Sequence, residues 1–532
     1  MKANPTRFWF VVIALGWSFD FLFWMKPAGV NIFLFVALCL GSGIFLLKAD
    51  GLRLSPRAGW LLIPIAFLAA VTFFRLEPMT VFLSLVSTLF LMGVFALTYL
   101  GGNWIRYGLV DYLLGYLTLI GSMIARPLGF AADVRRDQPE AGPKRSFWPI
   151  LRGIVIALPV VAIFASLLSS ADLVFADRFQ EFIELFNLEN LPEYIFRLVY
   201  ILVFAYAIAG AFLHAAQKSN DAADDKYSIR QFLGFTESVI VLGSVVILFA
   251  AFVVVQFQYF FGGNVNINLE GYTYSEYARR GFGELVTVAF FSLLMLLGLG
   301  GITKRESNTQ RRVFSILGIV LVGLVLVMLV SAFQRLVLYE TAYGFSRLRT
   351  YTHVFMIWLA ILLVAVVVLE FLRREREIGL AMVLASLGFA ASLSLLNVDA
   401  FIVRQNIQRE LHGASIQNPP PSRDRVELDA HYFLELSDDA VPEMAEGFRN
   451  KTLSVSIREQ IGAALACKLY DRENSKRDLS WQGFHLSRLT ADRVFADLKN
   501  DLAAYTVTDE DFPPTVETPG GAEFQCWRYS FD

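Results

Sequence analysis

Ionisable side chains inside or beside long apolar segments are the residues of this chain best suited to chemistry. Glu237 and Glu284 stand out, because a charged group at the centre of a membrane helix costs on the order of 2.5–3.5 kcal/mol to insert. Glu284 follows Arg280 by four residues and Arg280 follows Glu276 by four, so on a helix the three side chains share one face, with Arg279 beside them. This stretch can be an ion or proton site, a binding surface or a charge-neutralised helix end, and the sequence leaves all three open.

A second cluster occupies residues 334–351, with the sequence QRLVLYETAYGFSRLRTY. Arginines and tyrosines recur there at helical spacing, a glutamate lies among them and a glycine can end the helix. The cluster consists of Arg335, Tyr339, Glu340, Tyr343, Gly344, Arg347 and Arg349. Arginines bind phosphate and pyrophosphate through paired hydrogen bonds, so this cluster can bind a lipid head group. The alternative is an internally paired loop in which Glu340 neutralises an arginine.

A third polar group comes after the last long apolar segment and consists of Asn397, Asp399, Arg404 and Asn406. It marks either a functional site where the chain leaves the membrane or a helix that connects the membrane part rigidly to the C-terminal part.

Familiar catalytic motifs are missing from the sequence. It has no phosphate-binding loop ending in Gly-Lys, no His-Glu-x-x-His, no Gly-x-Ser-x-Gly and no dinucleotide fingerprint. The five histidines are scattered, and the three cysteines form no metal-ligand spacing. We therefore expect no metal, no cofactor and no nucleic-acid partner, and we expect a protein that is not an enzyme.

Long apolar segments must position these residues. The chain has 532 residues, 56% apolar and only 18% charged, against about 25% charged in ordinary soluble domains. A segment that crosses a bilayer must be helical to satisfy its own backbone, so we predict an all-α, polytopic transmembrane bundle. Its expected spans are eleven: residues 8–25, 30–47, 58–74, 79–99, 148–169, 195–215, 232–257, 282–301, 313–333, 352–372 and 379–396.

Residues 107–130 are also apolar enough to cross a membrane. Crossing would place the basic stretch 135–145 on the outer side, against the positive-inside rule. We therefore predict an interfacial or re-entrant helix on the inner face, since Asp111 and Arg126 lie near its ends.

Charge predicts the orientation and the domains. Lys and Arg are concentrated in alternate loops, which places the N-terminus inside. Residues up to Arg404 carry an excess of basic side chains and the remainder an excess of acidic ones. We expect a transmembrane bundle over 1–396, a helical exit and Pro-rich linker over 397–422, and a small, mainly helical extracytoplasmic domain over 423–532.

Cys467 and Cys526 both lie in this C-terminal domain. In an oxidising compartment they can close a loop of about sixty residues and stabilise the domain by roughly 4 kcal/mol. Two free buried thiols are the alternative, and the side of the membrane on which the domain lies decides between them.

Several of these stretches also carry a family resemblance over roughly residues 150–450. They are, in chain order, YTYSEYARRGFGEL, YETAYGFSRLRTYTHVFMIWL, NVDAFIVRQNIQR and LDAHYFLELSDDAVPEM. They resemble the motifs of uncharacterised polytopic bacterial inner-membrane proteins, the domain-of-unknown-function family four-one-seven-three, related to four-one-five-three. Phe345 and Ser346 stand where the family is expected to have Leu and Thr. The resemblance implies a bacterial cytoplasmic membrane and no established activity.

We prefer the interpretation of a non-enzymatic envelope sensor or scaffold with an external C-terminal domain, whose partners are the lipid bilayer and envelope proteins or lipid head groups. One alternative is an ion-coupled transporter that uses Glu237 or Glu284. Against this alternative, the sequence has no paired spans broken by Gly or Pro in two matching halves, which is the pattern typical of such transporters. The other alternative is a transferase for lipid-linked phosphate head groups, with the outer arginines binding pyrophosphate and Glu340 acting as base.

Overall fold

The computed structural model describes residues 4–137, 163–170, 191–217, 231–261, 282–415, 428–474, 480–509 and 512–527, with separate positions between 153 and 178. The chain divides into two compact units. One comprises Met1–Met25, Leu38–Arg53 and Leu117–Gln217, and the other comprises Lys26–Ala37, Leu54–Tyr116 and Lys218–Asp532.

Eleven helices in the described ranges are long and apolar enough to cross a membrane. They are α1 (Pro5–Phe23), α2 (Val30–Ala49), α3 with α4 (Pro56–Gly59 and Leu62–Phe74), α5 (Pro78–Thr98), α6 (Leu109–Asp137), α9 (Leu191–Ala215), α10 (Phe235–Phe261), α12 (Phe282–Ile302), α13 (Asn308–Tyr343), α14 (Arg347–Phe371) and α15 (Ile378–Leu396). All but α6 coincide with expected spans. About half of the remaining expected span, 148–169, lies outside the described residues.

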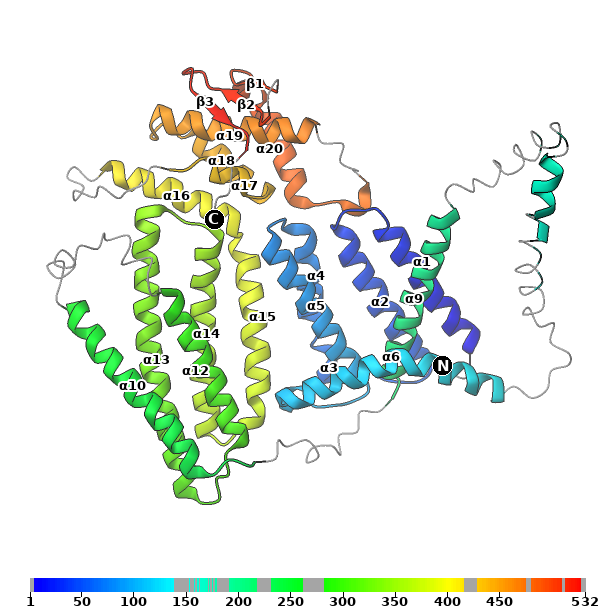
Figure 1. Cartoon of the computed structure of the whole chain (residues 1–532), viewed down its shortest axis with the longest axis horizontal. Coiled ribbons are helices and arrows are strands. Elements are labelled where there is room, and N and C mark those ends of the chain that lie inside the picture. Colours follow the sequence, from blue (N-terminus) through cyan, green and yellow to red (C-terminus); the bar gives the residue numbers. More distant parts are fainter. Residues whose placement is uncertain are drawn as a thin grey trace. The chain divides into compact units, whose positions relative to one another are not determined.

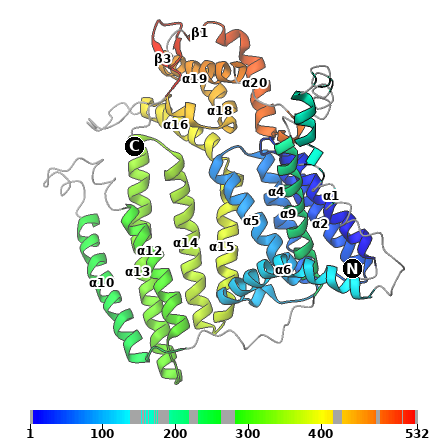
Figure 2. The same ribbon diagram turned by 45° about the vertical axis from the view of Figure 1, so that its right-hand side comes forward.

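Helix α6 is the segment that we predicted to lie in the interface. Its first turns contact α5, where the Tyr116 ring packs on Gly93 and stacks on Phe90 with ring centroids 5.3 Å apart. Figures 1 and 2 show these first turns of α6 running across the end of α5 and not alongside it. By length and composition α6 also qualifies as a span, so its interfacial placement stays a prediction.

In the first unit, α1 and α9 pack against each other. Gly16 of α1 allows the close approach, because a Cβ at this position would lie only 2.9 Å from the Cβ of Ala205 on α9. One turn further along, the guanidinium of Arg197 donates to both carboxylate oxygens of buried Asp20 at 3.0 and 2.6 Å. A charge inside α1 is thus neutralised by its neighbouring helix.

In the second unit, α12, α13 and α14 share one apolar core with α10, and α15 packs along α14 (Figure 1). Helix α13 begins with a reciprocal cap, in which the Ser307 hydroxyl accepts from the Gln310 amide and the Gln310 side chain accepts from the Ser307 amide. The α4–α5 hairpin joins this bundle through contacts between α5 and α15.

The chain after α15 continues in the same unit. Helix α16 (Val398–Ser415) lies across the ends of α13 and α14 (Figure 2) and is followed by α17 (Tyr432–Glu435), a 3-10 turn η7 (Asp438–Ala440), α18 (Val441–Arg449), α19 (Val455–Asn474) and α20 (Leu486–Leu502). Strands β1 (Thr506–Thr508), β2 (Thr515–Glu517) and β3 (Glu523–Gln525) form an antiparallel sheet in that order. Residues 416–422 of the expected helical exit and linker lie outside the described residues.

One apolar core holds this C-terminal part together. Val403 of α16, Phe433 of α17, Met444 of α18, Ile461 of α19 and Leu498 of α20 are all fully buried in it. Because Leu393 at the end of α15 belongs to the same core, the C-terminal helices and the last span are packed as one body.

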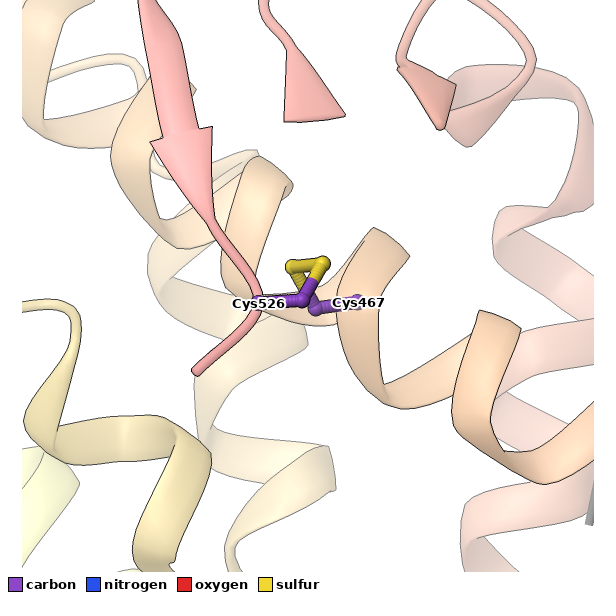
Figure 3. Close-up of a disulfide and its surroundings, with 2 residues drawn as sticks. All are labelled: Cys467 and Cys526. Atoms are coloured by element: carbon purple, nitrogen blue, oxygen red, sulfur yellow. A yellow bond between two sulfur atoms is a disulfide. The ribbon is translucent and has the colours of Figure 1, made fainter. Parts of the chain in front are cut away.

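A disulfide joins Cys467 of α19 to Cys526, the residue after β3 (Figure 3). The two Cα atoms are 5.2 Å apart, and the bond closes a loop of 59 residues. It ties the end of the sheet to the central helix of the C-terminal core. Cys39 is a free, buried thiol.

Candidate functional site

The ion pair between Arg347 and Asp399 is the centre of the candidate site. Arg347 is the first residue of α14, and Asp399 lies in the first turn of α16. The Arg347 Nε donates to Asp399 Oδ1 at 2.8 Å and its Nη2 donates to Oδ2 at 2.7 Å. Asp399 is completely buried, so this two-point pair holds a charge that has no access to water.

The same pair reaches the C-terminal helices. The backbone amide of Ser437 donates to Asp399 Oδ2 at 2.7 Å, and the backbone amide of Arg347 donates to the Tyr432 hydroxyl at 2.9 Å. Asp399 therefore joins three separate segments: the start of α14, the start of α16 and the turn before α18.

The turn between α4 and α5 supplies a second buried carboxylate, Glu77. It caps α5 by accepting from the Met79 amide at 2.9 Å and from the Thr80 amide at 2.7 Å. Its Oε1 also accepts the hydroxyl of Tyr351, one turn after Arg347 in α14. This contact connects the α4–α5 hairpin to the helix that carries the ion pair.

Asp439 completes the connection from the side of the C-terminal helices. Its Oδ2 accepts from the backbone amides of Leu76 at 2.7 Å and Glu77 at 3.1 Å, and its Oδ1 accepts the hydroxyl of Ser487 in α20. Burial raises the pKa of Asp439 above its ordinary value, while the hydrogen bonds from Ser487 and Leu76 act in the opposite direction. With those donors, Asp439 fixes the α4–α5 turn to η7 and α20.

We call this set of residues the junction network. The Arg75 guanidinium lies 4.0 Å from Asp439 and donates to the Ser394 carbonyl at the end of α15, so it borders the network on the membrane side. The members are Arg75, Glu77, Arg347, Tyr351, Asp399, Tyr432, Ser437, Asp439 and Ser487. They bring the ends of α4, α5, α14 and α15 together with four segments of the C-terminal part.

The turn between α13 and α14 is fixed beside the network. Asn406 of α16 accepts from the Phe345 amide at 2.7 Å and donates to the Phe345 carbonyl at 3.0 Å, as a neighbouring strand would. The Arg349 guanidinium donates to the Gly344 carbonyl and lies 4.1 Å from the centroid of the Tyr339 ring. Arg349 is thus paired within the cluster at 334–351, whereas Arg347 is paired with Asp399 outside it.

One interpretation of the cluster paired Glu340 with an arginine, and its partner in the structure is His353 of α14. Glu340 is 2% exposed, and its Oε2 lies 2.8 Å from Nε2 of His353. The Phe333 ring packs on the imidazole in a T-shaped arrangement, with ring centroids 4.4 Å apart. This pairing arises because α13 and α14 run side by side, which places residues thirteen apart in sequence opposite each other.

The other predicted residues lie apart from the network. Glu284 is exposed in the first turn of α12, and Glu237 is exposed at the start of α10, where it accepts from the Gly234 amide at 2.8 Å. These carboxylates are therefore helix-end groups. Glu276, Arg279 and Arg280 lie outside the described residues.

Three further members of the predicted clusters lie in helix packing or in a turn between helices. Tyr343 packs on Tyr339 with ring centroids 4.9 Å apart, and Arg335 is half-buried on α13. Asn397 has a left-handed backbone, with φ of 52°, and is the single residue between α15 and α16.

Sequence reasoning missed Glu77, Tyr351, Asp439 and Ser487 as site residues. The segment Glu77-Pro78 carried a recognisable signal, because an acidic residue before proline is typical of a helix start. Nothing in the sequence indicated that these side chains meet. In the part of the chain that the structure describes, no group of three His, Cys, Asp or Glu residues is placed to bind a metal.

These features define a polytopic integral membrane protein whose C-terminal helices are joined to the ends of its spans by buried charges. The model of a family described as a domain of unknown function (DUF4153) matches residues 62–447, from α4 to α18, and the chain belongs to this family. It is the second of the two related families named by the resemblance. The match contains every member of the junction network except Ser487. No curated protein and no solved structure matches the chain.

Proposed function

We propose that this protein is an envelope sensor or scaffold of a bacterial inner membrane, with its N-terminus inside and its C-terminal domain on the outer face. The observation that carries the proposal is Asp399, which binds Arg347 of a spanning helix and the Ser437 amide of the C-terminal domain at once. Any displacement of the domain must move or break these bonds, so a conformational change in the domain can be transmitted to the spans.

The orientation rests on two independent arguments. Basic residues are concentrated in the loops assigned to the inner side. The Cys467–Cys526 bond belongs to the opposite side, because disulfides form and persist in oxidising compartments such as the periplasm.

The two alternative functions receive less support. A transporter that uses Glu237 or Glu284 needs a carboxylate within the membrane, and both of these are exposed at helix ends. A transferase that uses the outer arginines needs free guanidinium groups, and Arg347 is bound to Asp399 while Arg349 is bound to Gly344.

The orientation is tested by labelling single cysteines in intact cells with a membrane-impermeant maleimide, in a Cys39→Ala background. Lys499→Cys, exposed on α20, should react from outside. Arg374→Cys, exposed after the opposite end of α14, is the matched control and should react only after permeabilisation. Labelling of both positions from the same side would reject the proposed topology.

The coupling is tested in a deletion strain scored for sensitivity to envelope stress. Wild-type protein should restore resistance, whereas Asp399→Asn and the milder Tyr351→Phe should not, at equal amounts in the membrane. Arg404→Gln, which breaks only the exposed pair with Glu443, is the control and should restore it. Full rescue by both junction variants would refute the proposal that the junction transmits a signal.

A further inference from the structure

A polar pocket of about 460 Å³ opens on the C-terminal domain next to the junction network. Its volume falls in the range of about 300–1,000 Å³ that is typical of small-molecule sites. Leu76 and Ser437 form part of its wall, and their backbone amides are the donors to Asp439 and Asp399. The pocket therefore borders the bonds that fasten the domain to the spans.

The lining carries charges of both signs in equal number. Three cations and three carboxylates face the pocket: Lys468, Arg472, Arg488, Glu435, Asp438 and Asp471. Arg472 is held within the protein, since it donates to Asp438 at 2.8 Å, to Asp492 at 2.6 Å and to the Arg488 carbonyl at 3.0 Å. A ligand with a single net charge would unbalance this lining, whereas a zwitterion preserves the balance.

Lys468 is a lining cation with hydrogen-bonding capacity to spare. Its ammonium donates to the Leu434 carbonyl at 3.2 Å and to the Leu436 carbonyl at 2.6 Å. An ammonium has three donors, and the third has no acceptor among the described residues. Burial lowers the pKa of Lys468 to about 8, so the group is still mostly charged at pH 7.

The disulfide lies beside Trp527, the aromatic residue of the pocket lining. Cys467 precedes Lys468 on α19, and its bond to Cys526 holds the neighbouring Trp527 at the pocket. The Trp527 side chain is 51% exposed, so its ring offers an apolar surface at the rim. An aromatic ring also attracts a ligand ammonium placed over its face.

We propose that this pocket binds a small zwitterion, an amino acid or a short peptide, with its carboxylate on Lys468 and its ammonium among Glu435, Asp438 and Asp471. The inference deepens the proposed sensor function and rests on it for the consequence of binding. Occupancy changes the contacts of Leu76 and Ser437, and through their amides it changes the environment of Asp439 and Asp399.

The test uses the full chain in lipid nanodiscs and titration calorimetry at pH 7. The probes are the twenty free amino acids and alanine peptides of two to four residues, which distinguish the two sources of zwitterion. We expect at least one probe to bind, and its C-terminal amide and its N-acetyl derivative to bind about tenfold more weakly, because each lacks one charge-assisted contact. Absence of binding by every probe, or equal binding of the amide and the parent compound, would overturn the proposal.

Variants localise the binding. Lys468→Met should weaken it about tenfold or more, and Lys499→Met, an exposed lysine on α20, should leave it unchanged. If Lys468→Met does not fold, Trp527→Ala at the exposed rim serves instead and should weaken binding with an unchanged melting temperature. Unchanged affinity in the folded pocket variant would overturn the proposal.

The binding and rescue experiments together distinguish failure of the proposed binding site from failure of the proposed sensor function. Binding that is lost in these variants, combined with full rescue of the deletion strain by Asp399→Asn, would retain the pocket and refute the sensor function. Absence of binding combined with loss of rescue by Asp399→Asn would refute the pocket and retain the sensor function.

Discussion

Arg347 and Asp399 form a buried ion pair, and replacing either residue alone leaves the other charge buried without a partner. Asp399 has no exposed surface, and Arg347 retains only 22% of its side-chain exposure. A buried charge that loses its partner keeps the whole cost of its removal from water. The pair is therefore more sensitive to substitution than its net contribution to folding would suggest.

The substitution Asp399→Asn should lower the free energy of unfolding by about 3–5 kcal/mol, because it leaves the Arg347 guanidinium without its carboxylate and weakens the bond to the Ser437 amide. Unfolding in mixed micelles, followed by circular dichroism, measures this change. Arg404→Gln is the matched control, and its exposed pair with Glu443 should contribute less than about 1 kcal/mol. Equal effects of the two variants would contradict this account of the junction.

His485, the residue that precedes α20, predicts how stability depends on pH. Burial lowers the pKa of His485 to about 4, against 6.5 in the unfolded chain. As the pH falls from 6.5 to 4, the unfolded state takes up a proton that the folded state does not, so the C-terminal part loses up to about 3 kcal/mol of stability in that window. His485→Gln should remove this part of the acid sensitivity in thermal melts. His412→Gln, at an exposed position on α16, should not change it.

At the scale of helices and turns, the α13–α14 connection shows how a tight turn is specified. Gly344 has φ of +81°, and a Cβ at this position would lie 2.6 Å from Asn406 Oδ1. Glycine is required both by the left-handed backbone and by the close approach of α16.

Gly344→Ala should lower the free energy of unfolding by about 1–3 kcal/mol, because it strains the backbone and displaces Asn406 from its two bonds with Phe345. The melting temperature of the full chain in nanodiscs measures the effect. Gly323→Ala, on an open surface of α13, is the control and should be neutral or slightly stabilising. A neutral Gly344→Ala variant would show that the turn tolerates a side chain.

The helices of this protein were predictable because the bilayer leaves an apolar segment few other structures. The runs that became α13, α14 and α15 are long, continuous and bounded by charge, so their positions follow from composition. The strands β1, β2 and β3 have three residues each, too few to show alternation. They were therefore not predicted.

The contacts of the site were harder to predict than its members. Arg347 and Asp399 were both singled out from the sequence, yet nothing in it paired them across 52 residues. Glu77 lies 274 residues from Tyr351, and Leu76 lies 363 residues from Asp439. Such contacts depend on how helices pack, and periodicity within one segment carries no information about packing between segments. Glu340 illustrates the same limit, since its partner is a histidine on the next helix.

For the molecule as a whole, the C-terminal part depends on a covalent closure. Its sheet is small, and the segment after α20 is joined to the helical core by the bond between Cys467 and Cys526. A cross-link of this kind restricts the unfolded chain and so favours the folded one.

Replacing both Cys467 and Cys526 with Ala should lower the free energy of unfolding of the C-terminal part by about 4 kcal/mol. Limited proteolysis of the full chain in nanodiscs measures the loss, and a reducing agent should reproduce it in the wild-type protein. Cys39→Ala removes the free thiol and is the control that should not respond to reduction. Equal protease resistance with and without the bond would contradict the prediction.

The single residue between α15 and α16 also has a mechanical consequence. Asn397 is the entire connection between two helices, so no flexible segment absorbs a change in the direction of either one. The 18 residues of α16 extend about 27 Å at 1.5 Å per residue. A tilt of α15 by about 5°, carried rigidly through Asn397, displaces the far end of α16 by about 2 Å. Asn397 would therefore carry even a small reorientation of α15 to the far end of α16.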